Sequence, residues 1–137
     1  MNISAFADLL ASRGLRLLPG SYAVPVDVLV ELQDGTVAHF TARGTTITLA
    51  LYAPSALQSL VIPPECGCGK HHEPVGPTRT ALRAGAEPLV ERTIDGELAF
   101  GWTGHEAGLL RLADAATHFF ELLVRASDSE PALVGVA

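Results

Sequence analysis

Two thiols and two imidazoles lie close together near the middle of the chain. The segment reads Cys66-Gly67-Cys68-Gly69-Lys70-His71-His72. Thiolate and imidazole are the usual ligands of tetrahedral zinc, and glycines allow a short loop to fold back around one ion. We therefore expect the two cysteines and two histidines to form a metal site, with zinc as the first candidate.

The spacing of these four residues differs from the common zinc patterns. Paired zinc-binding cysteines usually have two residues between them, whereas only Gly67 separates this pair. Two adjacent histidines rarely bind the same ion, so another side chain could complete the coordination shell. The candidates for that position are His39, His105, Glu65 and Glu73. A Cys-x-Cys pair also suits a soft ion such as Cu(I).

The same segment is compatible with two roles that need no metal. It can be an exposed Gly/Pro-rich loop that carries these residue types without binding an ion. It can also be a redox pair, because neighbouring cations such as Lys70 lower the pKa of a thiol. If a metal is bound, we expect it to hold the loop rather than to perform chemistry, since no catalytic set accompanies it.

The remaining histidines do not require a functional role. His39 falls on the mixed face of an expected strand, where an exposed imidazole is common. His105 lies beside an expected helix cap, and His118 lies on the polar face of the expected last helix. None of the three has a partner that the sequence identifies.

Motifs typical of enzymes are missing from the sequence. It contains no Gly-x-Ser-x-Gly elbow, no Gly-x-Gly-x-x-Gly fingerprint and no phosphate loop, because His71 follows the Gly69-Lys70 pair where a Ser or Thr is required. Asp34 and Asp95 belong to turns, where Asp is favoured for backbone reasons. We expect a protein that is not an enzyme, with no catalytic residues and no cofactor other than the metal.

Composition narrows the class of protein further. The chain has 137 residues, 48% of them hydrophobic and 18% charged, and a formal net charge of -6. It is long enough for one domain with a real core, and such an acidic surface repels nucleic acid. Neither a membrane-spanning run nor a signal peptide is visible, so a cytoplasmic protein is expected.

The first half of the chain predicts a helix followed by an antiparallel meander. Apolar residues recur at helical spacing over 3–13, with Asn2 or Ser4 as the cap. Alternating residues then predict strands over 24–32, 36–43 and 45–52. The turns between them are Asp34-Gly35, expected to be of type I′, and Arg43-Gly44.

The second half predicts a loop, a hairpin and a long helix. Segment 56–62 is too short to separate helix from strand, 63–77 is a Pro/Gly-rich loop, and 77–84 could form two turns of helix. Asp95-Gly96 predicts a second hairpin over 88–102. Thr103-x-x-Glu106 matches a capping box, so the last helix is expected over 104–126 and a flexible tail over 127–137.

These elements predict one α+β domain over 1–126: an antiparallel sheet packed by an N-terminal and a long C-terminal helix. Their order resembles that of the small acidic chaperones of type III secretion, which hold an extended segment of a client protein as dimers. The resemblance is topological, and the Cys/His loop stands where that family has its middle helix. We expect a protein-binding or adaptor module, with a homodimer as one option and a small metal- or thiol-dependent enzyme as the alternative.

Overall fold

A computed structural model describes residues 1–18, 27–61 and 78–136, and for residues 61, 78 and 128–136 it describes the backbone alone. The helices are α1 (Ile3–Ser12), α2 (Gly96–Phe100) and α3 (Leu112–Val136), with short 3-10 turns η1 (Pro54–Ala56) and η2 (Ala107–Leu109). The strands are β1 (Arg16–Leu17), β2 (Asp27–Glu31), β3 (Val37–Arg43), β4 (Thr46–Tyr52), β5 (Leu57–Val61), β6 (Thr78–Leu82) and β7 (Val90–Asp95).

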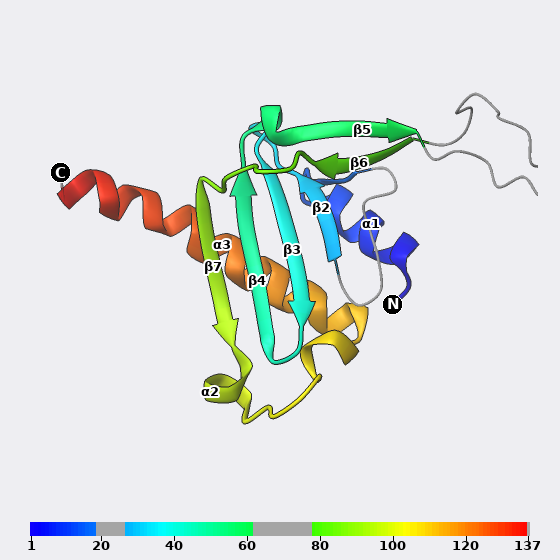
Figure 1. Cartoon of the computed structure of the whole chain (residues 1–137), viewed down its shortest axis with the longest axis vertical. Coiled ribbons are helices and arrows are strands. Elements are labelled where there is room, and N and C mark those ends of the chain that lie inside the picture. The colour runs from blue at the N-terminus through cyan, green and yellow to red at the C-terminus, as the bar shows by residue number, and fades with distance from the viewer. Residues whose placement is uncertain (19–26, 62–77, 137) are drawn as a thin grey trace, which may run out of the picture.

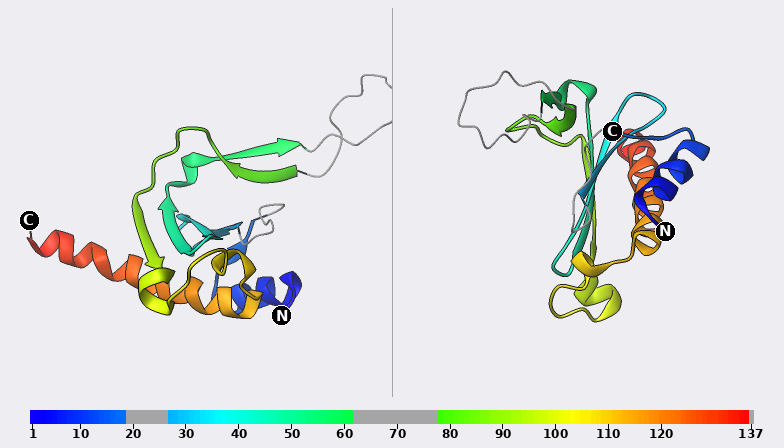
Figure 2. Two further views of the ribbon diagram at one scale, coloured as in Figure 1. Left: turned by 60° about the horizontal axis from the view of Figure 1, so that its bottom comes forward. Right: turned by 90° about the vertical axis from the view of Figure 1, so that its right-hand side faces the viewer.

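Five strands form one antiparallel sheet in the order β1-β2-β3-β4-β7. Helices α1 and α3 lie side by side across one face of this sheet (Figure 1). Strands β5 and β6 form a separate two-stranded sheet. This sheet is an arm that projects from the side of the five-stranded sheet opposite the helices (Figure 2). The expected α+β fold, with an antiparallel sheet and a helix from each end of the chain, is confirmed.

The core lies between the sheet and the two helices. Phe40 of β3, Phe6 of α1 and Phe119 of α3 are almost fully buried there. The Phe119 ring meets the Phe40 ring edge-on with 5.6 Å between centroids, and it meets the Phe6 ring edge-on at 6.4 Å. Edge-to-face contacts of this kind are the preferred geometry of aromatic pairs, so these three rings tie both helices to the sheet.

The predicted meander is confirmed, with one difference in its first turn. Strand pairs Val28–Phe40 and Phe40–Leu49 fix the register of β2, β3 and β4. Only Gly35 of the Asp34-Gly35 pair has a positive φ, at 88°, so the turn is not of type I′. Asp34 instead accepts a hydrogen bond from the backbone amide of Thr36, which stabilises a turn that needs one left-handed residue.

The hairpin expected over 88–102 is wrong. Residues 90–95 form β7, which pairs with β4 across a long sequence separation, for example Ile94 with Ile47. The next five residues form α2, and Asp95 is its N-cap, with its side chain accepting a hydrogen bond from the Glu97 amide. Asp is favoured both in turns and at helix N-caps, so this residue type fits either structure and does not distinguish them.

The second hairpin exists elsewhere, as β5 and β6. Its register pairs Leu57 with Leu82 and Val61 with Thr78. The ambiguous segment 56–62 is therefore largely strand, and the two helical turns suggested for 77–84 are wrong. Each segment is too short for its hydrophobic periodicity to distinguish helix from strand. The pairing between the two segments selects the strand conformation.

The last helix begins later than the capping box indicated. The Glu106 carboxylate does accept hydrogen bonds from the amides of Thr103 and Gly104, at 3.0 and 2.8 Å. These bonds precede the 3-10 turn η2, after which Leu110 is extended (ψ 138°) and interrupts the helix. Helix α3 therefore starts at Leu112, and its backbone continues to Val136, past the predicted end at residue 126. No helix in the described part of the chain is long and apolar enough to cross a membrane.

Candidate functional site

The four predicted metal ligands, Cys66, Cys68, His71 and His72, lie outside the described residues, as do Glu65 and Glu73. The structure does describe the two strands that carry the segment. Strand β5 ends where segment 62–77 begins, and β6 starts where it ends, with Val61 and Thr78 paired across the arm. The strand ends on either side of the Cys/His segment are thus held together by a strand ladder.

The base of this arm is packed on the sheet. Leu57 and Leu82 contact a small apolar cluster formed by Leu18, Leu29 and Val37, on the face opposite the two helices. The amide of residue 83 also donates a 2.7 Å hydrogen bond to the carbonyl of residue 56. Apolar packing and the backbone hydrogen bond fix the base of the arm on the sheet.

An ion-paired cluster lies on the same face of the sheet. Nε2 of His39 in β3 lies 2.8 Å from Oδ1 of Asp27 in β2, and the Arg43 guanidinium lies 3.3 Å from the other oxygen of Asp27. The side chains of Asp27 and His39 are each 26% exposed. His39 is therefore half-buried and paired, rather than an isolated exposed imidazole as the sequence suggested.

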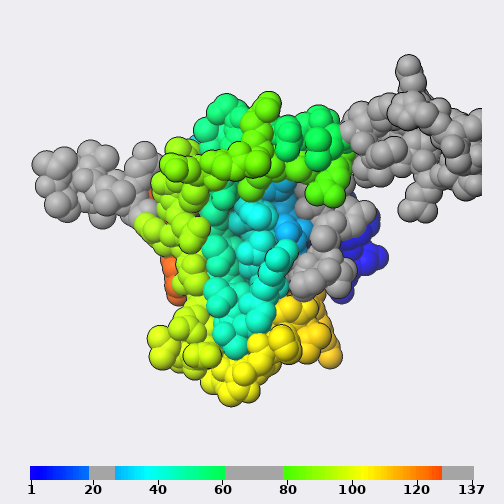
Figure 3. Space-filling model, viewed as in Figure 1, coloured from blue at the N-terminus to red at the C-terminus, as the bar shows by residue number. Residues whose placement is uncertain are grey.

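Tyr52 of β4 borders this cluster. Its ring lies 6.5 Å from the His39 ring, centroid to centroid. Burial raises the pKa of the Tyr52 hydroxyl above its usual value, and the negative charge of Glu91 raises it further. The phenol is therefore neutral at physiological pH and can act only as a hydrogen-bonding group, not as a phenolate. Figure 3 looks onto this face of the sheet, with the arm crossing one end of it and β3 and β4 visible below.

The described residues do not make a metal site by themselves. Within ranges 1–18, 27–61 and 78–136, no three His, Cys, Asp or Glu side chains come close enough to hold an ion. His105, one of the residues considered as a further ligand, is exposed in the segment between α2 and α3. That segment lies at the end of the sheet opposite the arm (Figure 1). His105 is thus remote from the strands that carry the loop.

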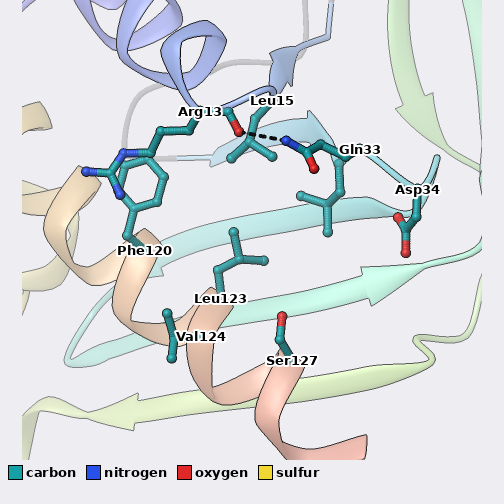
Figure 4. A pocket seen from close by; sticks show the side chains of 9 residues that line it. Arg13, Leu15, Gln33, Asp34, Phe120, Leu123, Val124 and Ser127 are labelled. Carbon is teal, nitrogen blue, oxygen red and sulfur yellow. Dashed lines mark hydrogen bonds between the residues drawn. The ribbon is translucent and has the colours of Figure 1, made fainter.

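A groove of about 480 Å³ opens on the helical side of the molecule (Figure 4). It lies between the end of α1, the β2–β3 turn and α3. Its floor is apolar, and its rim is polar. The floor consists of Leu15, Leu32, Phe120, Leu123 and Val124, and the rim of Arg13, Gln33, Asp34 and Ser127.

Two contacts hold the rim of this groove in place. The Arg13 guanidinium stacks over the Phe120 ring, 4.2 Å from its centroid. Gln33 donates a 3.3 Å hydrogen bond to the carbonyl oxygen of Arg13, which links the β2–β3 turn to the end of α1. At the other end of the rim, hydrogen bonds from Thr36 lower the pKa of the Asp34 carboxyl, which is therefore charged at neutral pH. Apolar floors with a few fixed polar groups are typical of binding surfaces.

A second cleft, of about 450 Å³, lies between β7, α2 and α3. His118 lines it and is not simply solvated as expected, since its side chain is only 16% exposed. Its Nδ1 atom is buried without a hydrogen bond among the described residues, and the nearest carboxylate oxygen, of Glu121, is 3.8 Å away. The Phe100 ring packs against the imidazole in a tilted arrangement, with 5.5 Å between ring centroids. The ring thus packs mainly as an apolar surface.

Sequence reasoning missed the Asp27–His39 pair and the groove for different reasons. The pair could have been found, because the β2–β3 register places Leu29 opposite His39 and Asp27 two residues away on the same face. The groove has no such signal, because it joins α1, the β2–β3 turn and α3, which are distant in sequence. The chain matches no protein-family model, no curated protein and no solved structure.

Proposed function

We propose that this protein is a non-enzymatic protein-binding module whose Cys66–His72 loop binds one zinc ion at the end of the β5–β6 arm. The zinc organises the loop, and the organised loop contacts the partner protein. Thiolate and imidazole ligands on one flexible loop support zinc, as they suit its tetrahedral coordination.

The paired ends of the loop are the observation that carries the proposal. Val61 and Thr78 lie opposite each other in the arm, so the strand ladder has already closed the segment between them. Closing a flexible loop costs conformational entropy, and here that entropy is lost when the arm forms rather than when the metal binds. A loop closed in this way can gather four ligands around an ion at a lower cost than an open chain.

The position of the arm supports a role in binding a partner. Its base is fixed on the sheet through Leu57 and Leu82, and its strands lead away from the body of the protein (Figure 2). Loops presented on a rigid scaffold commonly carry binding residues. Catalysis has less support, because in the described part of the chain no three His, Cys, Asp or Glu side chains come close enough to hold a catalytic metal ion.

Metal analysis of the purified protein tests the zinc site. The protein is produced without a histidine tag, and zinc is measured per chain for the wild type, for Cys66→Ser/Cys68→Ser and for His71→Ala/His72→Ala. We expect about one zinc per chain in the wild type and a loss of at least about tenfold in both double variants. His105→Ala is the matched control, since it removes an exposed histidine at the far end of the sheet and leaves the zinc content unchanged. Wild-type protein without stoichiometric metal refutes the site.

Limited digestion with trypsin tests what the metal does. Lys70 lies inside the loop, whereas Arg111 lies in the exposed segment just before α3. Chelation is expected to speed cleavage after Lys70 and to leave cleavage after Arg111 unchanged, because zinc orders only the loop. Equal rates at Lys70 with and without chelator contradict the organising role.

Comparison of bound proteins tests the partner-binding role. Proteins retained by the wild type are compared by quantitative mass spectrometry with those retained by Cys66→Ser/Cys68→Ser and by His105→Ala. The proposal expects a partner that the cysteine variant loses and the His105 variant keeps. Identical retention by all three proteins refutes a role of the loop in binding.

A further inference from the structure

The last part of α3 runs past the edge of the sheet. Figures 1 and 2 show the helix crossing behind β4 and β7 and then continuing beyond β7, where no other labelled element lies beside it. We call residues 128–136 the distal segment. Its sequence begins polar and then turns apolar, as Pro131-Ala132-Leu133-Val134-Gly135-Val136.

This segment is poorly suited to being a helix on its own. Relative to Ala, a Pro in a helix costs about 3 kcal/mol and a Gly about 1 kcal/mol, and the segment contains both, Pro131 and Gly135. Short isolated helices are marginal in water even without such residues, and most helices owe their stability to packing against something else. A helical backbone through Val136 therefore requires a surface on which the distal segment can pack.

A suitable surface begins on the same helix, directly before the distal segment. The groove of Figure 4 is lined along α3 by Phe120, Leu123, Val124 and Ser127. Val124, which belongs to the apolar floor, is 59% exposed. The α3 side of the groove, from residue 120 to 127, is about 10 Å long, and the distal segment is about 12 Å long at 1.5 Å per residue. A single chain cannot fill its own groove with this segment, because a continuous helix carries it away.

We propose that two copies of the chain form a two-fold symmetric dimer in which each distal segment occupies the groove of the other copy. In an antiparallel pair of α3 helices with the axis near residues 127 and 128, each groove faces the partner's distal segment. Residues 120, 124 and 127 line the groove and recur at helical spacing. Positions 131 and 134 follow at the same spacing, so they lie on the same face of α3. The contact between groove and distal segment occurs twice in such a dimer and leaves no copy of either surface free for a third chain, as in most homodimers.

The apolar character of both the groove and the distal segment indicates that a second copy of the chain fills the groove. The floor of the groove is formed by leucine, phenylalanine and valine side chains, and the second half of the distal segment is apolar throughout. Burying both removes apolar surface from water in two equivalent places. Another protein would have to supply a helix of the same kind, whereas a second copy brings one in the required position by symmetry.

Sedimentation velocity of the full chain tests the dimer. We expect a wild-type particle of two 14.4 kDa chains at concentrations on the order of 100 µM. Val124→Glu, in the groove, and Val134→Glu, in the distal segment, should each raise the dissociation constant by at least about tenfold, because every substitution buries two charges in the symmetric interface. Far-UV circular dichroism checks that both variants keep the fold, and Val124 lies outside the buried core.

Leu98→Glu is the matched control, because Leu98 is 87% exposed on α2 and lies outside the groove. It should leave the dimer intact. A wild-type chain that stays monomeric, a dimer that survives both valine substitutions, or a dimer equally weakened by Leu98→Glu would each overturn the proposal. All measurements are made with chelator present, so the outcome does not depend on zinc in the Cys66–His72 loop.

Discussion

Asp27 and His39 form a 2.8 Å hydrogen bond between neighbouring strands on the face of the sheet that the helices leave uncovered. Arg43 approaches the second oxygen of the same carboxylate. Asp27 in β2 therefore contacts two side chains of β3, His39 and Arg43. The pair is a diagonal neighbour in the antiparallel ladder, a position from which long side chains can reach each other.

Removing this carboxylate is expected to weaken the β2–β3 pairing. Asp27→Ala should lower the free energy of unfolding by about 1 kcal/mol, because a half-buried hydrogen bond to a charged group is lost and His39 is left without its acceptor. Asp27→Asn should cost less, since an amide oxygen can still accept from the imidazole. Urea denaturation measures both values. Asp8→Ala, at an exposed position of α1, is the control, and an equal loss in that variant would contradict a specific contribution of the pair.

Phe119 is expected to be the most sensitive aromatic position of α3. Its ring is fully buried and contacts the rings of Phe6, Phe40 and Phe120. Phe119→Ala should destabilise the protein by about 3–5 kcal/mol, the usual cost of a large cavity in a packed core. Phe100→Ala is the comparison, because Phe100 is 48% exposed and should cost clearly less. Similar losses for both would show that Phe119 does not anchor the helix.

Glu106 should make stability depend on pH in the acidic range. Hydrogen bonds from the backbone amides of Thr103 and Gly104 lower the pKa of its carboxyl below the ordinary value of 4.5. Because the folded-state pKa is the lower one, this contribution is present above pH 4.5 and is lost as the pH falls through the folded-state value. Glu106→Gln should therefore reduce the melting temperature at pH 7 and have a smaller effect at pH 3.

The control for this measurement is Glu97→Gln, on the exposed first turn of α2. Among the described residues, no two backbone amides donate hydrogen bonds to the Glu97 carboxylate as Thr103 and Gly104 do to Glu106. If the two variants change with pH in the same way, the hydrogen bonds of Glu106 do not cause the effect.

Local chemistry in the sequence determined the first helix and the meander. Asn2 caps α1 through its side-chain oxygen, as expected from its position before an apolar stripe. Alternating residues placed Val28 and Val30 on the buried face of β2, because successive side chains of a strand point to opposite sides. These elements could be predicted because each depends on residues close together in the chain.

The tertiary structure decided the elements whose local signals allowed two answers. Asp95 suits a hairpin turn or a helix N-cap, and only the pairing of β7 with β4 makes it the cap of α2. The two strands of the arm are too short to specify their own conformation, and each is selected by its partner. The groove beside Phe120 and the Asp27–His39 contact likewise exist only after distant segments have met. The Cys66–His72 segment illustrates both parts. Its residue types come from the sequence, whereas the closure of the strands before and after it comes from the pairing of Val61 with Thr78, a contact that no local pattern encodes.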